Sequence, residues 1–131
     1  MPGSDILLVD DDETILELFK LMLNLEGFSV ETAKSSQEAL EKMRSERFQV
    51  AFLDMIMPEM RGHELAKEMK KLDKDIKIIF VTGYSDFETI EALDFEIFDI
   101  LVKPISDDAL YSAAKRALSK HQDQQASTGL M

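Results

Sequence analysis

The chain has 131 residues with no cysteine, 45% of them hydrophobic and 31% charged, and a net charge of −11. These values predict one globular domain without disulfides, and the acidic excess disfavours direct binding of nucleic acid, whose phosphates attract lysine and arginine. No apolar run approaches the ~18 residues of a membrane span, and the first residues lack a basic and apolar leader, so we expect a cytoplasmic protein without membrane contact.

The first third of the chain predicts a strand, a helix and a second strand. Residues 6–9 form a short apolar run, typical of a strand buried on both faces, and the acidic residues 10–12 follow it. Helical spacing then puts apolar side chains on one face, up to a stop at Gly27: Ile15, Leu18, Phe19, Met22 and Leu23. Residues 28–33 alternate between apolar and polar, which indicates a half-exposed strand at a sheet edge.

The middle of the chain predicts two helices around a buried strand. A helix begins at Ser35, with Glu38 three residues later as a possible capping box. The apolar run 50–53 ends at Asp54. A further helix starts at about Gly62 and carries three apolar residues on its inner face: Leu65, Met69 and Leu72.

The last third predicts two more strands and two more helices. Two apolar runs end on a hydroxyl and an ammonium group: residues 78–81 before Thr82, and residues 100–102 before Lys103. Between them a helix is expected near residues 86–94. A final helix follows, with Asp107 or Asp108 as its cap.

Strand and helix alternate five times, which implies right-handed βαβ units in a three-layer α/β sandwich. The edge position of the second strand gives the strand order 2-1-3-4-5, the flavodoxin-like arrangement. We expect this domain to span residues 5–119, with residues 120–131 as a polar tail or the start of a linker. In such sheets ligands bind outside the carboxyl ends of the strands, so the polar groups that end the apolar runs converge there.

The converging groups suit phosphoryl chemistry. The Asp54 carboxylate is a competent nucleophile toward phosphorus, but its charge must be screened as it attacks an anionic group. Mg²⁺ needs one or two carboxylates besides water, and Asp11 with Asp54 supplies that minimum. Lys103 adds a positive charge for a phosphoryl oxygen, and the Thr82 hydroxyl can donate a hydrogen bond to the same group.

Four segments resemble the CheY-like receiver domain of bacterial two-component response regulators: residues 6–12, residues 53–62, Val81-Thr82-Gly83 and Lys103-Pro104. The resemblance covers about residues 5–119. It implies that Asp54 accepts a phosphoryl group from the phosphohistidine of a sensor histidine kinase or phosphotransfer protein. It also implies Mg²⁺ (or Mn²⁺) bound by Asp11, Asp54 and the backbone carbonyl of Ile56, with Asp10 acting through a water molecule.

The resemblance further implies a switch rather than an enzyme acting on other molecules. Thr82 would move toward the phosphoryl group and remodel the face formed by the fourth helix, the fifth strand and the fifth helix. That face would control an output domain, a partner protein or a phosphorylation-linked homodimer. A cis peptide before Pro104 and a structural glycine at position 62 belong to the same pattern.

Several positions depart from the family pattern. Ile100 stands where receivers usually hold a tyrosine or phenylalanine that reports the Thr82 movement, and residues 94–99 also differ, so we expect a shortened or altered fourth helix. Ile56 and Tyr84 are bulky residues at positions that border the path of the attacking water. We therefore expect the acyl phosphate to be shielded and to hydrolyse slowly.

Three alternatives remain open from the residues. Asp54 alone could be a cap after a strand, a common role for aspartate. Residues 10–14 also fit the D-x-D-x-T signature of haloacid-dehalogenase-type phosphohydrolases, with Asp10 as nucleophile, although this leaves Asp54 without a role. A receiver-like docking module that does not switch is the third alternative.

Overall fold

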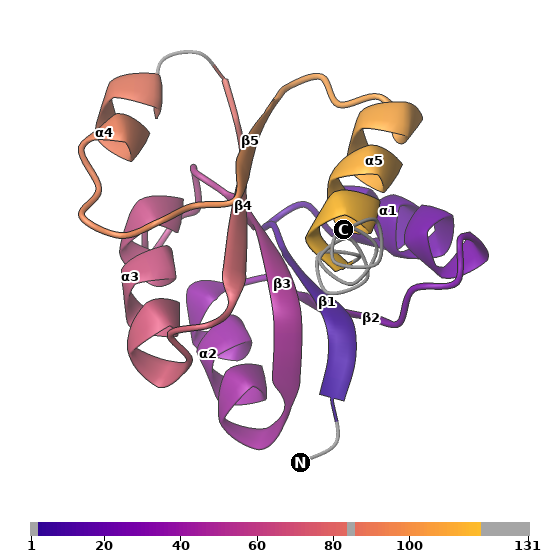
Figure 1. Cartoon of the computed structure of the whole chain (residues 1–131), viewed down its shortest axis with the longest axis horizontal. Helices are drawn as coiled ribbons and strands as arrows, with labels where there is room; N and C mark the ends of the chain where they lie inside the picture. Colours follow the sequence, from indigo (N-terminus) through magenta and orange to yellow (C-terminus); the bar gives the residue numbers. More distant parts are fainter. Residues whose placement is uncertain (1–2, 84–85, 119–131) are drawn as a thin grey trace, which may run out of the picture.

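The structure, a computed structural model, describes residues 3–83 and 86–118. Within these residues five parallel strands form one sheet of order β2-β1-β3-β4-β5, which confirms the expected α/β fold and strand order (Figure 1). The strands are β1 (Gly3–Val9), β2 (Val30–Ala33), β3 (Arg47–Asp54), β4 (Lys77–Thr82) and β5 (Asp99–Val102). The helices are α1 (Glu13–Leu25), α2 (Ser36–Ser45), α3 (Gly62–Leu72), α4 (Phe87–Glu91) and α5 (Asp107–Leu118).

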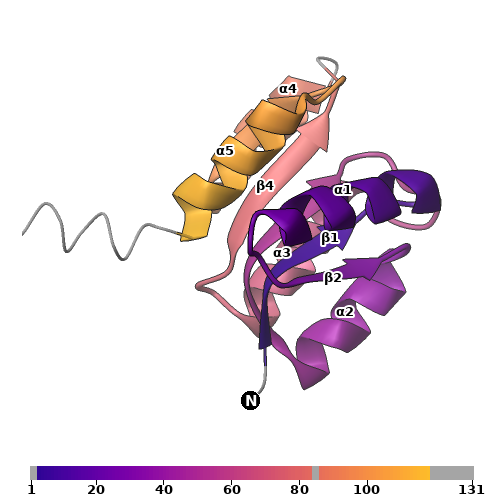
Figure 2. The same ribbon diagram turned by 90° about the vertical axis from the view of Figure 1, so that its right-hand side faces the viewer.

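Helices cover both faces of the sheet, as Figures 1 and 2 show. Alternate residues of β1 point to opposite faces: Leu7 and Val9 belong to the apolar cluster shared with α2 and α3, and Ile6 and Leu8 to the cluster shared with α1 and α5. Both sets are buried. The apolar runs are therefore continuous because each strand has a core on both sides.

The strand register brings the polar residues to one edge of the sheet. Val9 pairs with Leu53, so Asp10 and Asp54 come next to each other beyond that pair. Thr82 pairs with Val102, which puts Lys103 directly after the pair. The carboxyl ends of β1, β3, β4 and β5 thus meet, as the sequence predicted.

Most helix ends follow the expected signals. The Asp12 carboxylate accepts the Thr14 N–H at 2.9 Å, and the Ser35 hydroxyl accepts the Glu38 N–H at 3.1 Å. Gly27 takes a φ of 95°, a left-handed conformation that suits glycine after a helix. The expected cap of α5 was wrong: the Ser106 hydroxyl accepts the Ala109 N–H, and Asp107 and Asp108 lie within the first turn.

Two residues expected on inner helix faces are exposed instead. Leu18 is 48% exposed, because it lies about 200° around α1 from the buried Leu16 at 3.6 residues per turn. Leu72 is 46% exposed because it is the last residue of α3. Across the described parts of the chain, no helix has the length and apolar character needed to cross a membrane.

The fourth helix is short, which confirms the expected alteration. It ends at Glu91 after five residues, and only its Ile90 is buried. The chain that follows is irregular up to β5, and its apolar side chains Leu93, Phe95 and Ile97 pack against the α2–α3 cluster. Ile100 joins the same cluster while partly buried. The expected tail, residues 120–131, lies outside the described residues.

Candidate functional site

Three carboxylates meet at the carboxyl end of the sheet. Asp10 follows β1, Asp11 begins the loop to α1, and Asp54 is the last residue of β3. One oxygen from each lies within 4.8 Å of the other two. Asp10 and Asp54 are buried, at 8% and 5% exposure, whereas Asp11 is exposed. Such a set of oxygen ligands, open to solvent on one side, fits a hard divalent cation that keeps some of its waters.

The electrostatics of this cluster favour a bound cation. Burial raises the pKa of Asp10 to about 6, and the neighbouring charges of Asp54 and Asp11 act in the same direction. The Asp12 N–H, which donates to Asp10 Oδ1 at 2.9 Å, opposes this rise. A divalent cation would offset the repulsion between the three carboxylates and keep Asp10 ionised.

Lys103 is paired with the central carboxylate. Its Nζ lies 3.1 Å from Asp54 Oδ1, and its side chain is 47% exposed against 6% for that of Asp54. The Ile56 N–H approaches the same oxygen at 3.3 Å. The ammonium group therefore reaches the site from the solvent side, where an incoming anionic group would also arrive.

The Thr82 hydroxyl is near the site but does not donate its hydrogen bond to Asp54. It donates to Asp86 Oδ2 at 2.7 Å and lies 3.0 Å from the Gly83 carbonyl oxygen. The other carboxylate oxygen of Asp86 accepts from Arg61 Nη2 at 2.8 Å. Thr82 is 1% exposed and Asp86 is 6% exposed.

Sequence reasoning missed Asp86 and Arg61. Asp86 was interpreted only as the start of the fourth helix, and its carboxylate makes no capping bond there. The usable signal was its place four residues after Thr82, the last residue of a buried strand. Nothing in the sequence indicated that Arg61, from the loop after β3, would be its partner.

The remaining site residues lie in the loops after β3 and β5. Gly62 allows α3 to start against the end of β3: an added Cβ would lie 2.8 Å from Met55 Cα, and the Gly62 N–H donates to the Met55 carbonyl. Ile56 is 62% exposed beside Asp54. The Lys103–Pro104 peptide is cis. Tyr84 lies outside the described residues.

An open hollow of about 650 Å³ adjoins the acidic cluster. Its polar part consists of the three cluster aspartates with Asp12 and Lys103. Its apolar part comes from α1, from the end of β4 and from the segment after β5: Ile15, Leu18, Phe19, Val81, Pro104 and Ile105. Polar groups grouped beside an apolar lining are typical of binding sites.

The sequence matches the family model of the response regulator receiver domain over residues 6–115. Two similar curated proteins are the transcriptional regulatory protein ZraR of Escherichia coli K12, 37% identical over 116 residues, and the CpxR homologue of Haemophilus influenzae, 36% identical over 117 residues. These alignments cover 88% and 89% of this chain, but only 26% and 51% of the two relatives. The chain thus spans a quarter to a half of their length.

Solved structures of response regulators also resemble this chain. A CheY-like receiver domain protein from Methanospirillum hungatei superposes with a TM-score of 0.84 at 34% identity, covering 93% of this chain and 98% of that one. The response regulator TrrA from Thermotoga maritima, in complex with Mg²⁺ and BeF, gives a TM-score of 0.74 at 37% identity, covering 87% of this chain and 98% of that one.

Proposed function

The chain belongs to the response regulator receiver domain family, and from that premise we propose that Asp54 is its phosphoacceptor. Receiver domains are phosphoacceptor signalling domains of two-component systems, and this chain is one of them rather than a conventional enzyme. We propose residues 5–119 as its extent. The observation that carries the assignment of Asp54 is its contact with Lys103 within the cluster of three carboxylates.

Asp54 is suited to attack phosphorus because its charge is held in place and partly offset. A carboxylate oxygen of Asp54 forms a bond to the phosphorus of a phosphohistidine while the phosphorus–nitrogen bond breaks. The electron pair returns to the imidazole, which takes up a proton from solvent. The Lys103 ammonium, now 3.1 Å from Asp54, then has a phosphoryl oxygen as its partner.

We propose that Asp11, Asp54 and the backbone carbonyl of Ile56 would hold Mg²⁺ or Mn²⁺, with Asp10 acting through a water. When bound, the cation supplies positive charge that screens the acidic cluster and the incoming phosphoryl group. The mutual approach of the three carboxylates supports this assignment, because it concentrates negative charge that a cation would offset. The pKa of Asp10, raised first by burial and further by the charges of Asp54 and Asp11, is consistent with it.

The proposed signal is a movement of Thr82 toward the phosphorylated Asp54, read out on the face of α4, β5 and α5. The short α4 and β5, which carries Ile100, belong to that face. Ile56, exposed beside Asp54, would shield the acyl phosphate from water, and Tyr84 is proposed to act in the same way from a position outside the described residues.

The proposed partners follow from the family and the hollow beside the site. A sensor histidine kinase or a phosphotransfer protein would donate the phosphoryl group and rest its apolar surface on α1 and the segment after β5. An output domain, a partner protein or a second phosphorylated copy would read the switch. Because several relatives are transcriptional regulatory proteins, control of transcription through a separate output domain in the cytoplasm is the proposed role.

The earlier alternatives are not favoured. A phosphohydrolase with Asp10 as nucleophile would leave Lys103 paired to a residue without a role, whereas Lys103 contacts Asp54. The family match over residues 6–115 likewise favours a phosphoacceptor over a docking module that does not switch.

Labelling would test the assignment. The protein is incubated with Mg²⁺ and acetyl phosphate, and mass spectrometry locates the modified residue. We expect one phosphoryl group on Asp54, none in Asp54→Asn, and normal labelling in Asp73→Asn, which removes an acid at the opposite end of the sheet. A phosphoryl group on Asp10 would overturn the proposal in favour of the hydrolase.

A further inference from the structure

We propose that Asp86, held by Arg61, is a positioning residue that keeps the Thr82 hydroxyl away from Asp54 and thereby sets how readily the domain switches. This inference rests on the proposed function of Asp54 and extends it to the regulation of the same site. It starts from a contact that phosphoacceptor chemistry does not require. The buried carboxylate of Asp86 accepts a hydrogen bond from the Thr82 hydroxyl.

The Thr82 hydroxyl has one proton and therefore donates to one acceptor at full strength. In this structure its shorter contact is to Asp86 Oδ2, at 2.7 Å, in a buried environment. A hydrogen bond to an ionised acceptor is stronger than one between neutral groups, and burial strengthens it further. A phosphoryl group on Asp54 must therefore compete with the Asp86 carboxylate for the same proton.

Arg61 fixes the competing carboxylate. Its Nη2 lies 2.8 Å from Asp86 Oδ1, so each oxygen of Asp86 serves one partner. The backbone of Arg61 is also fixed, since its N–H donates to Glu64 Oε1 at 3.0 Å at the start of α3. Asp86 is thus tied to the loop that follows Asp54 and cannot follow Thr82 without breaking an ion pair.

The position of Asp86 connects the loss of its bond to Thr82 with the face formed by α4, β5 and α5. It directly precedes α4, which has five residues and a single buried one, Ile90. When Thr82 leaves, Asp86 loses one of its two partners at the point where this short helix begins. The hydrogen bond from Thr82 to Asp86 therefore couples the hydroxyl to α4. Its strength sets the fraction of molecules in which Thr82 has left Asp86, the released state.

Weakening the bond should raise the apparent affinity for a phosphoryl group. A ligand that binds only the released state has an apparent dissociation constant inversely proportional to the population of that state. Asp86→Asn keeps the shape of the side chain but replaces the charged acceptor with a neutral one. Loss of a charge-assisted hydrogen bond changes such a population by about tenfold.

The probe is beryllofluoride with Mg²⁺, a phosphoryl mimic, added to the whole chain. Binding is followed by the backbone amide signals of Gly83 and of residues 87–91. We expect Asp86→Asn to bind beryllofluoride about tenfold more tightly than the wild type, and Asp86→Ala to shift affinity in the same direction. Asp73→Asn is the matched control: it removes another aspartate paired with an arginine, at 3.8 Å, at the opposite end of the sheet, and should bind like the wild type.

Asp86 is proposed to act only through Thr82, which a purely structural role would not require. In a Thr82→Ala background, the change from Asp86 to Asn should therefore leave beryllofluoride affinity unaltered. Equal affinity of the wild type and Asp86→Asn, or the same gain with and without Thr82, would overturn the inference. Failure of the folded wild type to bind beryllofluoride at all would instead overturn the proposed function of Asp54.

Discussion

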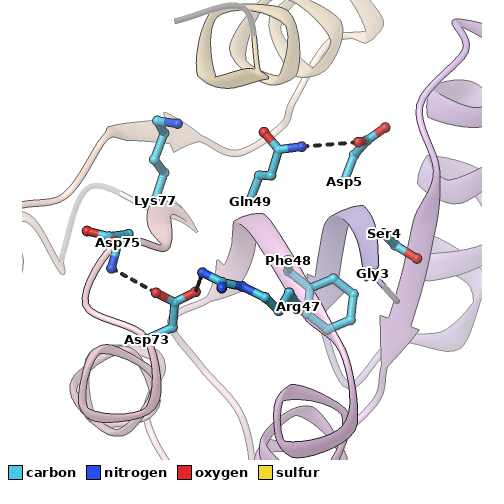
Figure 3. A pocket seen from close by; sticks show the side chains of 9 residues that line it. All are labelled: Gly3, Ser4, Asp5, Arg47, Phe48, Gln49, Asp73, Asp75 and Lys77. Carbon is cyan, nitrogen blue, oxygen red and sulfur yellow. Dashed lines mark hydrogen bonds and ion pairs between the residues drawn. The ribbon is translucent and has the colours of Figure 1, made fainter. Parts of the chain in front are cut away.

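The two ends of the parallel sheet carry the same kinds of charged residue in different arrangements. At the amino end, a hollow of about 320 Å³ is lined by Asp5, Arg47, Asp73, Asp75 and Lys77 among others (Figure 3). There Asp73 accepts the Asp75 N–H at 2.9 Å and lies 3.8 Å from Arg47, whose side chain is 66% exposed. Asp5 accepts the Ser29 N–H at 3.0 Å.

At the carboxyl end, Asp10 and Asp54 are buried next to Asp11, and Lys103 is the basic partner of Asp54. At the amino end Asp5 thus holds the segment before β2 and Asp73 holds a turn, whereas Asp10, Asp11 and Asp54 lie together at the carboxyl end. Convergence and burial, more than residue type, therefore distinguish the proposed site from the polar surface at the other end of the sheet.

The largest expected difference between the two ends concerns their basic residues. Lys103→Met should slow phosphorylation by acetyl phosphate by about 10²-fold, the usual cost of losing one charge-stabilising donor. Arg47→Met should leave the rate unchanged, because its ion pair is long and exposed. Initial rates of Asp54 labelling provide the measurement, and a comparable loss in both variants would contradict the distinction.

The next largest difference is expected between the acidic residues of the two ends, in their effect on Mg²⁺ binding. Asp11→Asn should weaken Mg²⁺ binding by at least about tenfold, since the ion has few protein carboxylates to replace the lost one. Asp75→Asn, which also removes an exposed acid, should bind Mg²⁺ like the wild type. Titration of amide signals with Mg²⁺ distinguishes the two, and unchanged affinity in Asp11→Asn would show that the cluster is not the metal site.

The lifetime of the acyl phosphate tests whether Ile56 shields the carboxyl end of the sheet from water. Ile56→Asn should shorten that lifetime roughly fivefold, because one hydrogen bond to the attacking water lowers the barrier by about 1 kcal/mol. Leu72→Asn is the control, since it replaces another exposed apolar residue, at the end of α3. Decay of phosphorylated protein is timed after removal of the donor, and equal lifetimes would remove the shielding role of Ile56.

The smallest effect concerns an acid at the carboxyl end that is structural. Glu59 accepts the backbone N–H and the hydroxyl of Ser36 at the start of α2, and these bonds lower its pKa below 4.5. Its stabilisation is therefore complete above pH 4.5 and is lost as the pH falls through the lowered pKa of the folded state.

Glu59→Gln should accordingly reduce the free energy of unfolding at pH 7 by less than about 1 kcal/mol, because the group is exposed and screened. The difference between variant and wild type should shrink toward zero in acid. Urea unfolding at pH 7 and at pH 3 measures both values. A larger difference at the lower pH would show that the sign assigned to the Glu59 contribution is wrong.

Local sequence was sufficient for the fold and for the membership of the cluster. Each apolar run is short and continuous because it is buried on both faces, and the alternating segment 28–33 marked the edge, where β2 spans Val30–Ala33. The residue after each run then had to lie at the shared edge. Asp10, Asp54 and Lys103 could be grouped on this basis, and the structure brings them together.

Other features depended on contacts between distant segments. Whether Ser106 or Asp107 caps α5 depends on where the chain turns after Pro104, and the exposure of Leu18 depends on which side of α1 the sheet covers. The ion pair from Asp86 to Arg61 joins segments 25 residues apart in the chain, and the bond from Thr82 to Asp86 depends on how the chain turns after β4.

The sequence by itself determined which groups gather at the carboxyl end, because strand periodicity and the order of the runs are encoded residue by residue. Only the tertiary structure decided the partner of each group. A hydroxyl or a carboxylate bonds within about 3 Å, and distances of that size follow from the packing of loops rather than from spacing along the chain.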